Sequence, residues 1–154
     1  AMPEKFDLEY TGPDGERHRP VVIHRVIYGA IERFFGILIE HFGGAFPAWL
    51  APVQAAVIPV SPAYEDYGRS VLDRLTAQGF RAEMNSGSET LNYRIRSAQT
   101  QQIPYMLVVG ERERESDSVS VRHRRKANLG NMGVQDFMTR LGEEVRSRAL
   151  DRTQ

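Results

Sequence analysis

The chain is organised around the run Val53-Gln54-Ala55-Ala56-Val57-Ile58-Pro59-Val60, which Ser61 and Pro62 follow. A short, nearly all-apolar run between prolines is typical of a strand that is buried on both faces. Ser61 suits a helix N-cap. Pro62 suits the first helical turn, where the N–H that it lacks would have no partner. The stretch therefore predicts a strand that leads directly into a helix, as at the start of a β-α-β unit.

The residues after this strand alternate between the two kinds of regular structure. We expect a helix of about 17 residues that ends at Gly79, because cap signals bound its apolar stripe. Further strands are expected over 80–84, 104–110 and 118–124, turns over 111–117 and 128–133, and helices from the cap Ser88 and from Val134. Strands that alternate with helices predict an α/β domain with a mostly parallel sheet, in which one strand is antiparallel.

The residues before this strand form a separate group. Alternating patterns over 6–10 and 17–26, with a turn between them, predict a β-hairpin. Apolar side chains at helical spacing predict a helix over 31–42, which two glycines end. Residues 46–52 are apolar and rich in proline, so we expect this connector to pack between two units.

The composition narrows the classes of function. Lys+Arg and Asp+Glu are both 20, so the net charge is zero and any nucleic-acid binding must come from a local patch. The absence of cysteine excludes disulfides and thiol catalysis. No apolar run reaches the length of a membrane span, and no phosphate-binding glycine loop or Ser-His-Asp order is present.

The strongest local charge lies in the run Val119-Ser120-Val121-Arg122-His123-Arg124-Arg125-Lys126. Alternation places Val119 and Val121 on one face, and Ser120, Arg122 and Arg124 on the other. Such a patch suits phosphates or unpaired bases, although a solvated strand edge is the simpler interpretation.

Two other charged residues could join this patch. Glu113 could accept hydrogen bonds from a base edge. In the helix that follows Ser88, Arg94 and Arg96 lie off the apolar stripe, and Arg96 could extend the same surface. Single-stranded RNA, whose bases can be splayed out, is the natural candidate partner.

Two features upstream could bind a metal or a nucleotide. His24 ends an apolar run, but a metal site needs three or four ligands and no other histidine has ligand spacing to it, so spacing alone favours a structural histidine. The small residues Gly29 and Ala30 would let a flat ligand approach the backbone, and Arg33 could hold a phosphate. A solvated Glu32–Arg33 pair is the simpler interpretation.

Several stretches in this order resemble class II aminoacyl-tRNA synthetases, in their threonyl-tRNA synthetase form. Residues 19–25 and 29–34 resemble motif 3, and His24-Arg25 and residues 46–54 carry the threonyl-specific features. Residues 103–110, 119–122 and 128–130 resemble the anticodon-binding domain of the same enzymes. The likeness extends from Phe6 to Arg148.

The resemblance implies the domain organisation. Residues 1–50 would be a β-hairpin and helix remaining from a class II catalytic domain. Residues 51–154 would be an anticodon-binding domain with a mixed, mostly parallel five-stranded sheet flanked by helices.

The resemblance also implies roles for single residues in the catalytic part. Arg33 would be the catalytic arginine that contacts ATP, with Gly29 and Ala30 beside the nucleotide. Ala30 stands where many members carry serine, so one polar contact would be missing. His24 would be one of three protein ligands of a zinc ion that recognises threonine.

In the terminal domain the resemblance implies anticodon contacts. Glu113 and Arg122 match positions that read the anticodon, and Arg96 and Arg124 would assist them. Threonine anticodons share G and U as second and third letters, and a carboxylate beside a guanidinium is chemically suited to them.

The implied protein is the C-terminal part of a cytoplasmic threonine–tRNA ligase. At full length it would use ATP and Zn²⁺, bind threonine tRNA, form a homodimer and have no membrane partner. Motifs 1 and 2 and two zinc ligands are absent from this sequence, so we expect the piece alone to be inactive and to bind neither cofactor tightly.

Two alternatives remain. One is a non-catalytic RNA-binding adaptor or accessory subunit that reuses the domain. The other is a generic α/β module with a solvated basic strand. Retention of both His24 and Arg33 favours the synthetase, because an adaptor has no use for them.

Overall fold

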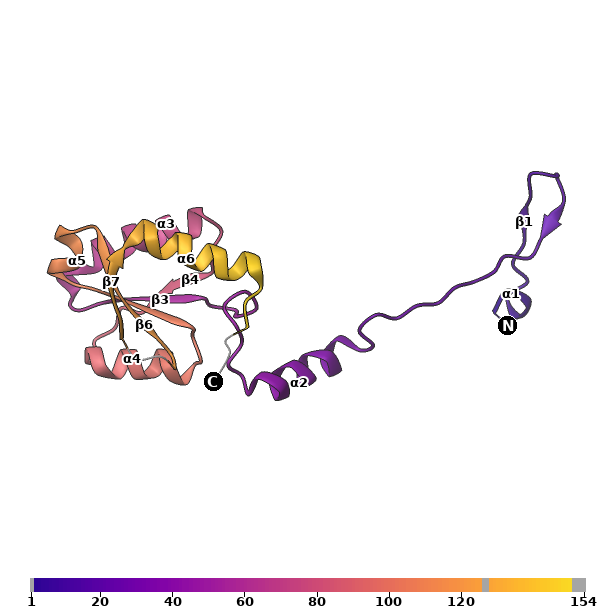
Figure 1. The fold of residues 1–154 in the computed structure, drawn as a ribbon. Coiled ribbons are helices and arrows are strands. Elements are labelled where there is room, and N and C mark those ends of the chain that lie inside the picture. The colour runs from indigo at the N-terminus through magenta and orange to yellow at the C-terminus, as the bar shows by residue number, and fades with distance from the viewer. Residues whose placement is uncertain (1, 126–127, 151–154) are drawn as a thin grey trace. The chain divides into compact units, whose positions relative to one another are not determined.

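The computed structural model describes residues 2–125 and 128–150 (Figure 1). The chain divides into two compact units, residues 1–36 and 37–154. Lys126, the last cation of the basic run, lies outside the described residues. The predicted domain boundary at residue 50 stays a prediction.

The first unit contains a small hairpin. A short helix, α1 (Met2–Lys5), precedes β1 (Tyr10–Thr11) and β2 (Arg17–His18), which pair antiparallel. The hairpin is therefore confirmed, but the predicted strands over 6–10 and 17–26 are wrong in extent. An alternating pattern becomes a strand only where one face is buried and a neighbour is present. Here Val21 and Ile23 are 87% and 85% exposed.

The helix after the hairpin has the predicted bounds. It is α2 (Ile31–Phe42), and Gly43 and Gly44 follow it with φ of 57° and 77°. Positive φ is the left-handed conformation in which helices commonly end, and glycine adopts it without steric cost.

The second unit is built on a mixed sheet of five strands in the order β4-β3-β5-β6-β7. Their bounds are β3 (Ala55–Pro59), β4 (Ala82–Met84), β5 (Tyr105–Val109), β6 (Ser118–His123) and β7 (Asn128–Gly133). Strands β4 and β5 both pair parallel with β3, while β6 pairs antiparallel with β5 and with β7. All five residues of β3 are buried, as the apolar run predicts.

The chain leaves β3 as its sequence predicts. A 3-10 turn, η1 (Pro62–Tyr64), leads into the helix α3 (Glu65–Ala77). Ser61 and Pro62 occupy the expected N-cap and first-turn positions, although the Ser61 side chain makes no capping hydrogen bond.

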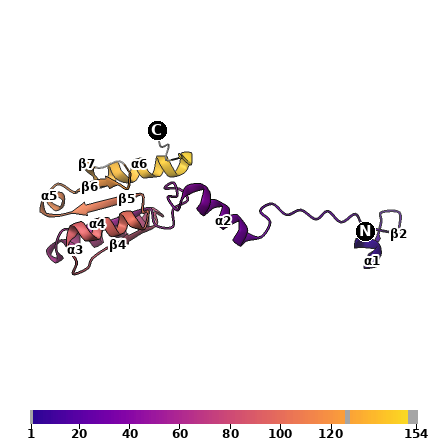
Figure 2. The same ribbon diagram turned by 90° about the horizontal axis from the view of Figure 1, so that it is seen from below.

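Helices cover the sheet on both faces. The helices α3 and α6 (Val134–Ser147) lie on one face, and α4 (Leu91–Thr100) lies on the other (Figure 1). The short helix α5 (Glu111–Glu115) lies at the end of the sheet away from the connector, in both views (Figures 1 and 2).

Two apolar clusters fill these layers. Val57, Leu107 and Val121 pack with Leu75 of α3 and Phe137 of α6. On the opposite face, residues of β3 and β5 pack with α4, namely Ala56, Ile58, Met106 and Val108 with Ile95 and Ala98. Apolar side chains of α4 and α6 thus face the sheet, and the two helices that the sequence predicts after Ser88 and from Val134 are present.

Several local predictions are wrong. Residues 111–117 contain a helix, and residues 128–133 form the fifth strand. The glycines that indicated a turn are accommodated in an edge strand, where Gly130 has φ 90° beside a register shift between Val121 and Arg122. Such bulges occur preferentially at sheet edges.

Two predictions about α4 are also wrong. Its N-cap is Thr90, whose side chain accepts a hydrogen bond from the Tyr93 N–H at 3.4 Å, and not Ser88. Arg94 does not lie off the buried face, because only 6% of it is exposed.

Candidate RNA-binding face

The exposed cation of β6 is Arg122. Val119 and Val121 are fully buried, so the alternation places Arg122 on the opposite face of the sheet, where it is exposed. It pairs with Met106, whose side chain belongs to the cluster beneath α4. Residues directly opposite in an antiparallel pair share a face, so Arg122 lies on the α4 side.

Strand β7 widens this polar face. Ser120 pairs with Asn131, and Arg122 pairs with Asn128. Both asparagines are exposed. The sequence did not indicate them, because the pattern over 128–133 predicts a turn. We call Ser120, Arg122, Asn128 and Asn131 the β6–β7 face.

Arg96 lies on the same side of the sheet. It is an exposed residue of α4, and α4 packs on β3 and β5 on the side to which Arg122 points. Arg122, Asn128 and Asn131 are exposed and Ser120 is half-buried, so most of the β6–β7 face is open to solvent beside α4.

Glu113 lies at one end of the sheet. Its Oε2 accepts a hydrogen bond from the Gly110 N–H at 3.0 Å and so forms half of a capping box for α5. Met106 is the strand partner of Arg122, and Gly110 comes four residues after Met106. Four residues of an extended strand span about 13 Å, so Gly110 is about that far along the sheet from the level of Arg122. No described contact joins Glu113 to Arg122, and their shared RNA surface stays a prediction.

Arg124 has an environment that differs from the predicted one. Its guanidinium donates to the carbonyl oxygens of Phe46 at 2.6 Å, Gln102 at 2.9 Å and Ala45 at 3.0 Å. The expectation that Arg124 shares the exposed face with Arg122 is therefore wrong, because these contacts hold its side chain against the connector. An anticodon contact from Arg124 would require breaking them.

A second arginine binds the connector from the other side of β3. Arg81 donates through Nε to the carbonyl oxygen of Ala51 at 2.9 Å and through Nη2 to that of Trp49 at 3.0 Å. The buried Gln54 amide donates to Ala48 O at 2.9 Å and accepts from the Arg81 N–H at 2.9 Å. The connector thus packs on the second unit through its backbone carbonyls as well as the buried side chains of Ala48 and Ala51, and its expected packing between two units stays a prediction.

The residues that the sequence suggests for binding a metal ion or a nucleotide lie in the first unit and are exposed. His24, Gly29, Ala30 and Arg33 are all solvent-exposed, and Gly29 has φ 68°. Within residues 2–125 and 128–150 no group of three His, Cys, Asp or Glu side chains could hold a metal ion. The described residues therefore do not fit a zinc ion by themselves, since His24 supplies one ligand where three or four are needed.

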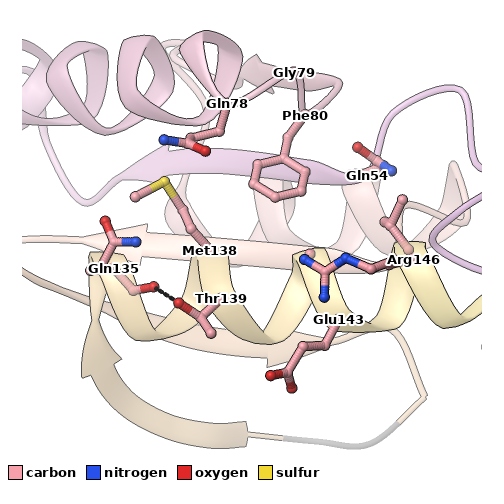
Figure 3. Close-up of a pocket in the computed structure, with 11 residues that line it drawn as sticks. Gln54, Gln78, Gly79, Phe80, Gln135, Met138, Thr139, Glu143 and Arg146 are labelled. Carbon is pink, nitrogen blue, oxygen red and sulfur yellow. Dashed lines mark hydrogen bonds between the residues drawn. The ribbon is translucent and has the colours of Figure 1, made fainter.

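A hollow of about 480 Å³ lies on the opposite face of the sheet, between α6 and the turn after α3. Figure 3 shows Phe80 from the turn and Met138 from α6 extending into the space between these two elements, with Thr139 donating to the Gln135 carbonyl at 3.0 Å. Because α6 and α3 cover the face away from Arg122, this hollow is not part of the β6–β7 face.

Comparison with known proteins identifies the second unit. The family model described as the anticodon binding domain matches residues 54–144, which is more than half of the chain. The chain belongs to the anticodon-binding domain family. The β6–β7 face, Arg96 and Glu113 all lie within the matched residues of this anticodon-binding domain.

Relatives extend the similarity to both units. The chain is 52% identical over 149 residues to the threonine–tRNA ligase of Caldanaerobacter subterraneus subsp. tengcongensis, covering 97% of this chain and 23% of that protein. It is 54% identical over 150 residues to the threonine–tRNA ligase of Thermus thermophilus, with the same coverage. The chain thus spans about a quarter of the length of the curated relatives that it matches.

A solved structure shows the same fold. The RNA binding domain of threonyl-tRNA synthetase from Cryptosporidium parvum Iowa II aligns with a TM-score of 0.80 and 33% identity, over 93% of this chain and 36% of that one. No helix described in this chain is long and apolar enough to cross a membrane.

Proposed function

We propose that this chain is the C-terminal part of a threonine–tRNA ligase, and that its anticodon-binding domain binds the anticodon loop of threonine tRNA. The observation that carries the proposal is Arg122, an exposed guanidinium on a strand whose alternate side chains are buried in the core. The family of the domain and the high identity to threonine–tRNA ligases support the choice of partner.

Each residue of the face has a proposed role. Arg122 donates to carbonyl oxygens or phosphates of the loop, and Arg96 adds positive charge from α4. Asn128 and Asn131 flank Arg122 with amide groups that suit base edges. One oxygen of the Glu113 carboxylate is bound to Gly110, and the other remains to accept from the N–H groups of a guanine.

The upstream residues complete a site whose other parts lie outside this chain. Arg33 binds ATP beside Gly29 and Ala30, and His24 contributes one ligand of a zinc site in the complete cytoplasmic enzyme, which is a homodimer. The isolated chain has neither a full ligand set nor the rest of the nucleotide site, so it does not activate threonine by itself.

Binding to an RNA hairpin tests the role of Arg122. We expect Arg122→Ala to weaken binding of a hairpin that carries a threonine anticodon by about 1–3 kcal/mol, measured by fluorescence anisotropy at fixed salt. It should also reduce the preference for this loop over a loop in which the guanine is replaced.

Arg125→Ala is the charge-matched control. Arg125 is exposed and lies just beyond the end of β6, outside the β6–β7 face. Its removal should weaken both hairpins equally, because it takes away positive charge without taking away a contact to a base. Unchanged affinity of the Arg122→Ala protein for both hairpins would contradict the proposal.

The adaptor alternative is separated by a different measurement. Threonine-dependent ATP–pyrophosphate exchange by the complete protein, lost on Arg33→Ala, supports the ligase. Hairpin binding by a complete protein that lacks this exchange supports an adaptor.

A further inference from the structure

Arg94 is a buried cation with few partners. Only 6% of it is exposed, and its Nη1 donates to the Asn85 carbonyl oxygen at 3.1 Å. Within the described residues its side chain makes no other hydrogen bond and no ion pair, and its Nε is buried without an acceptor. A buried charge without a matched partner is costly, so this arrangement indicates a ligand that supplies acceptors.

Arg94 lines a hollow of about 450 Å³ between α4, β4 and the loop that joins them. The other charged residues that line it are Glu83 and Glu89, and Tyr93 lies at its side with 61% of its surface exposed. The hollow lies beside the edge strand β4, whereas Arg122 is on β6, three strands across the sheet or about 14 Å away. It is therefore separate from the β6–β7 face.

Gly87 brings a carboxylate close to Arg94. A Cβ on Gly87 would collide with Glu89 Oε2, and Arg94 Cδ lies 4.0 Å from the same position. The absence of a side chain at residue 87 thus leaves room for the Glu89 carboxylate near the aliphatic part of the Arg94 side chain. Glu89, whose carboxylate is an acceptor, and Arg94, whose guanidinium is a donor, therefore line the same hollow. Among the described contacts they form no ion pair with each other.

We propose that this hollow binds an unpaired guanine base. The Arg94 guanidinium would donate to the guanine O6 and N7, the Glu89 carboxylate would accept from its N1–H and N2–H groups, and Tyr93 would offer a ring for stacking. The charged residues that line the hollow are two carboxylates and one guanidinium, so its net negative charge disfavours binding of a phosphate group there.

Two sources can supply the guanine, namely the bound RNA and a free nucleotide. If the guanine belongs to the bound RNA, the inference deepens the proposed function and rests on it. If the guanine belongs to a free nucleotide, the inference does not depend on the proposed function. The pocket itself is tested with guanosine monophosphate and the full 154-residue chain.

Nucleotide titrations followed by isothermal calorimetry and NMR test the pocket. We expect guanosine monophosphate to bind at least about tenfold more tightly than adenosine monophosphate, whose 6-amino group would face the guanidinium. Arg94→Gln and Glu89→Gln should each reduce guanosine monophosphate binding by about tenfold. Glu111→Gln, an exposed carboxylate in α5, is the matched control and should change nothing.

Gly87→Ala keeps Arg94 in place and tests the geometry if Arg94→Gln does not fold. The new Cβ displaces the Glu89 carboxylate, so the preference for guanosine over adenosine monophosphate should fall. Gly36→Ala, whose Cβ would meet nothing within 4 Å, is the control. Equal binding of the two nucleotides to the unmodified chain, or a Gly87→Ala protein with full preference, would overturn the proposal.

Competition identifies the source of the base. If the anticodon hairpin displaces guanosine monophosphate, the pocket binds a base of the RNA. If the two bind simultaneously, the pocket binds a free nucleotide. Either result supports the existence of a guanine-binding pocket. The Arg122→Ala protein should still bind guanosine monophosphate, which separates failure of the anticodon proposal from failure of this one. Absence of guanosine monophosphate binding at millimolar concentration would overturn the inference.

Discussion

Three arginines in this chain have different environments. Arg122 is exposed, Arg94 is buried, and Arg124 binds three backbone carbonyls. The environment of Arg122 could be predicted, because Val119 and Val121 fix which face of the strand is buried. The contacts of Arg124 could not, because its acceptors in the connector are far away in sequence.

The contacts of Arg124 predict a stability effect that Arg125 should not share. Arg124→Ala leaves the carbonyls of Ala45, Phe46 and Gln102 without this donor, so we expect a loss of about 1.5–3 kcal/mol in the free energy of unfolding. Urea denaturation measures it. Arg125→Ala removes the same charge from an exposed position and should change stability by less than about 0.5 kcal/mol. Equal losses in the two variants would contradict a structural role for Arg124.

Tyr67 predicts a dependence of stability on alkaline pH. Burial, with the negative charge of Asp117 adding to it, raises the pKa of Tyr67 from 10.0 to about 12, and its hydroxyl donates to Ser118 O at 2.8 Å. Because this pKa is higher in the folded than in the unfolded state, the protonated Tyr67 hydroxyl contributes fully to the free energy of unfolding below pH 10. This contribution is lost as the pH rises toward 12.

The comparison of the unmodified chain with Tyr67→Phe isolates this contribution. The difference between their melting temperatures should be constant from pH 7 to pH 9 and should shrink between about pH 10 and 12. Tyr93→Phe, at an exposed tyrosine, is the control. A difference that stays constant up to pH 12 would rule out the proposed role of the hydroxyl.

At the scale of elements, the start of α4 shows how a local signal can mislead. Ser88 and Thr90 are both good N-cap residues by type, but only the Thr90 side chain accepts a hydrogen bond from the first turn. We expect Thr90→Ala to lower the free energy of unfolding by about 0.5–1 kcal/mol. Ser88→Ala should have almost no effect in the same urea titration, and the reverse order would place the cap at Ser88.

The elements that could be predicted are those whose burial is complete. The strands β3 and β5 are buried along their whole length, and the stripe of α6 faces one continuous core, so their apolar patterns are unambiguous. The edge strand β7 is held by pairing with β6 and carries Gly130 at positive φ, so its sequence resembles a turn. The two asparagines of the candidate face were missed for that reason.

At the scale of the whole molecule, the connector is bound to the anticodon-binding domain. Arg81, Gln54 and Arg124 bind carbonyl oxygens between residues 45 and 51 from both sides of β3. Ala48 and Ala51 are also buried. A protein that starts at residue 53 would therefore lose the acceptors of two guanidinium groups together with this apolar packing.

Truncation at two positions tests this dependence. Residues 45–154 should unfold at the same urea concentration as residues 37–154, because the retained connector supplies every one of these carbonyls. Residues 53–154 should be less stable by about 3 kcal/mol or more, since two charge-assisted sets of hydrogen bonds are lost. Arg124→Ala should then destabilise residues 45–154 but have a much smaller effect in residues 53–154, where its acceptors at Ala45 and Phe46 are already absent. Equal midpoints for the two truncated proteins would show that the connector contributes nothing to the domain.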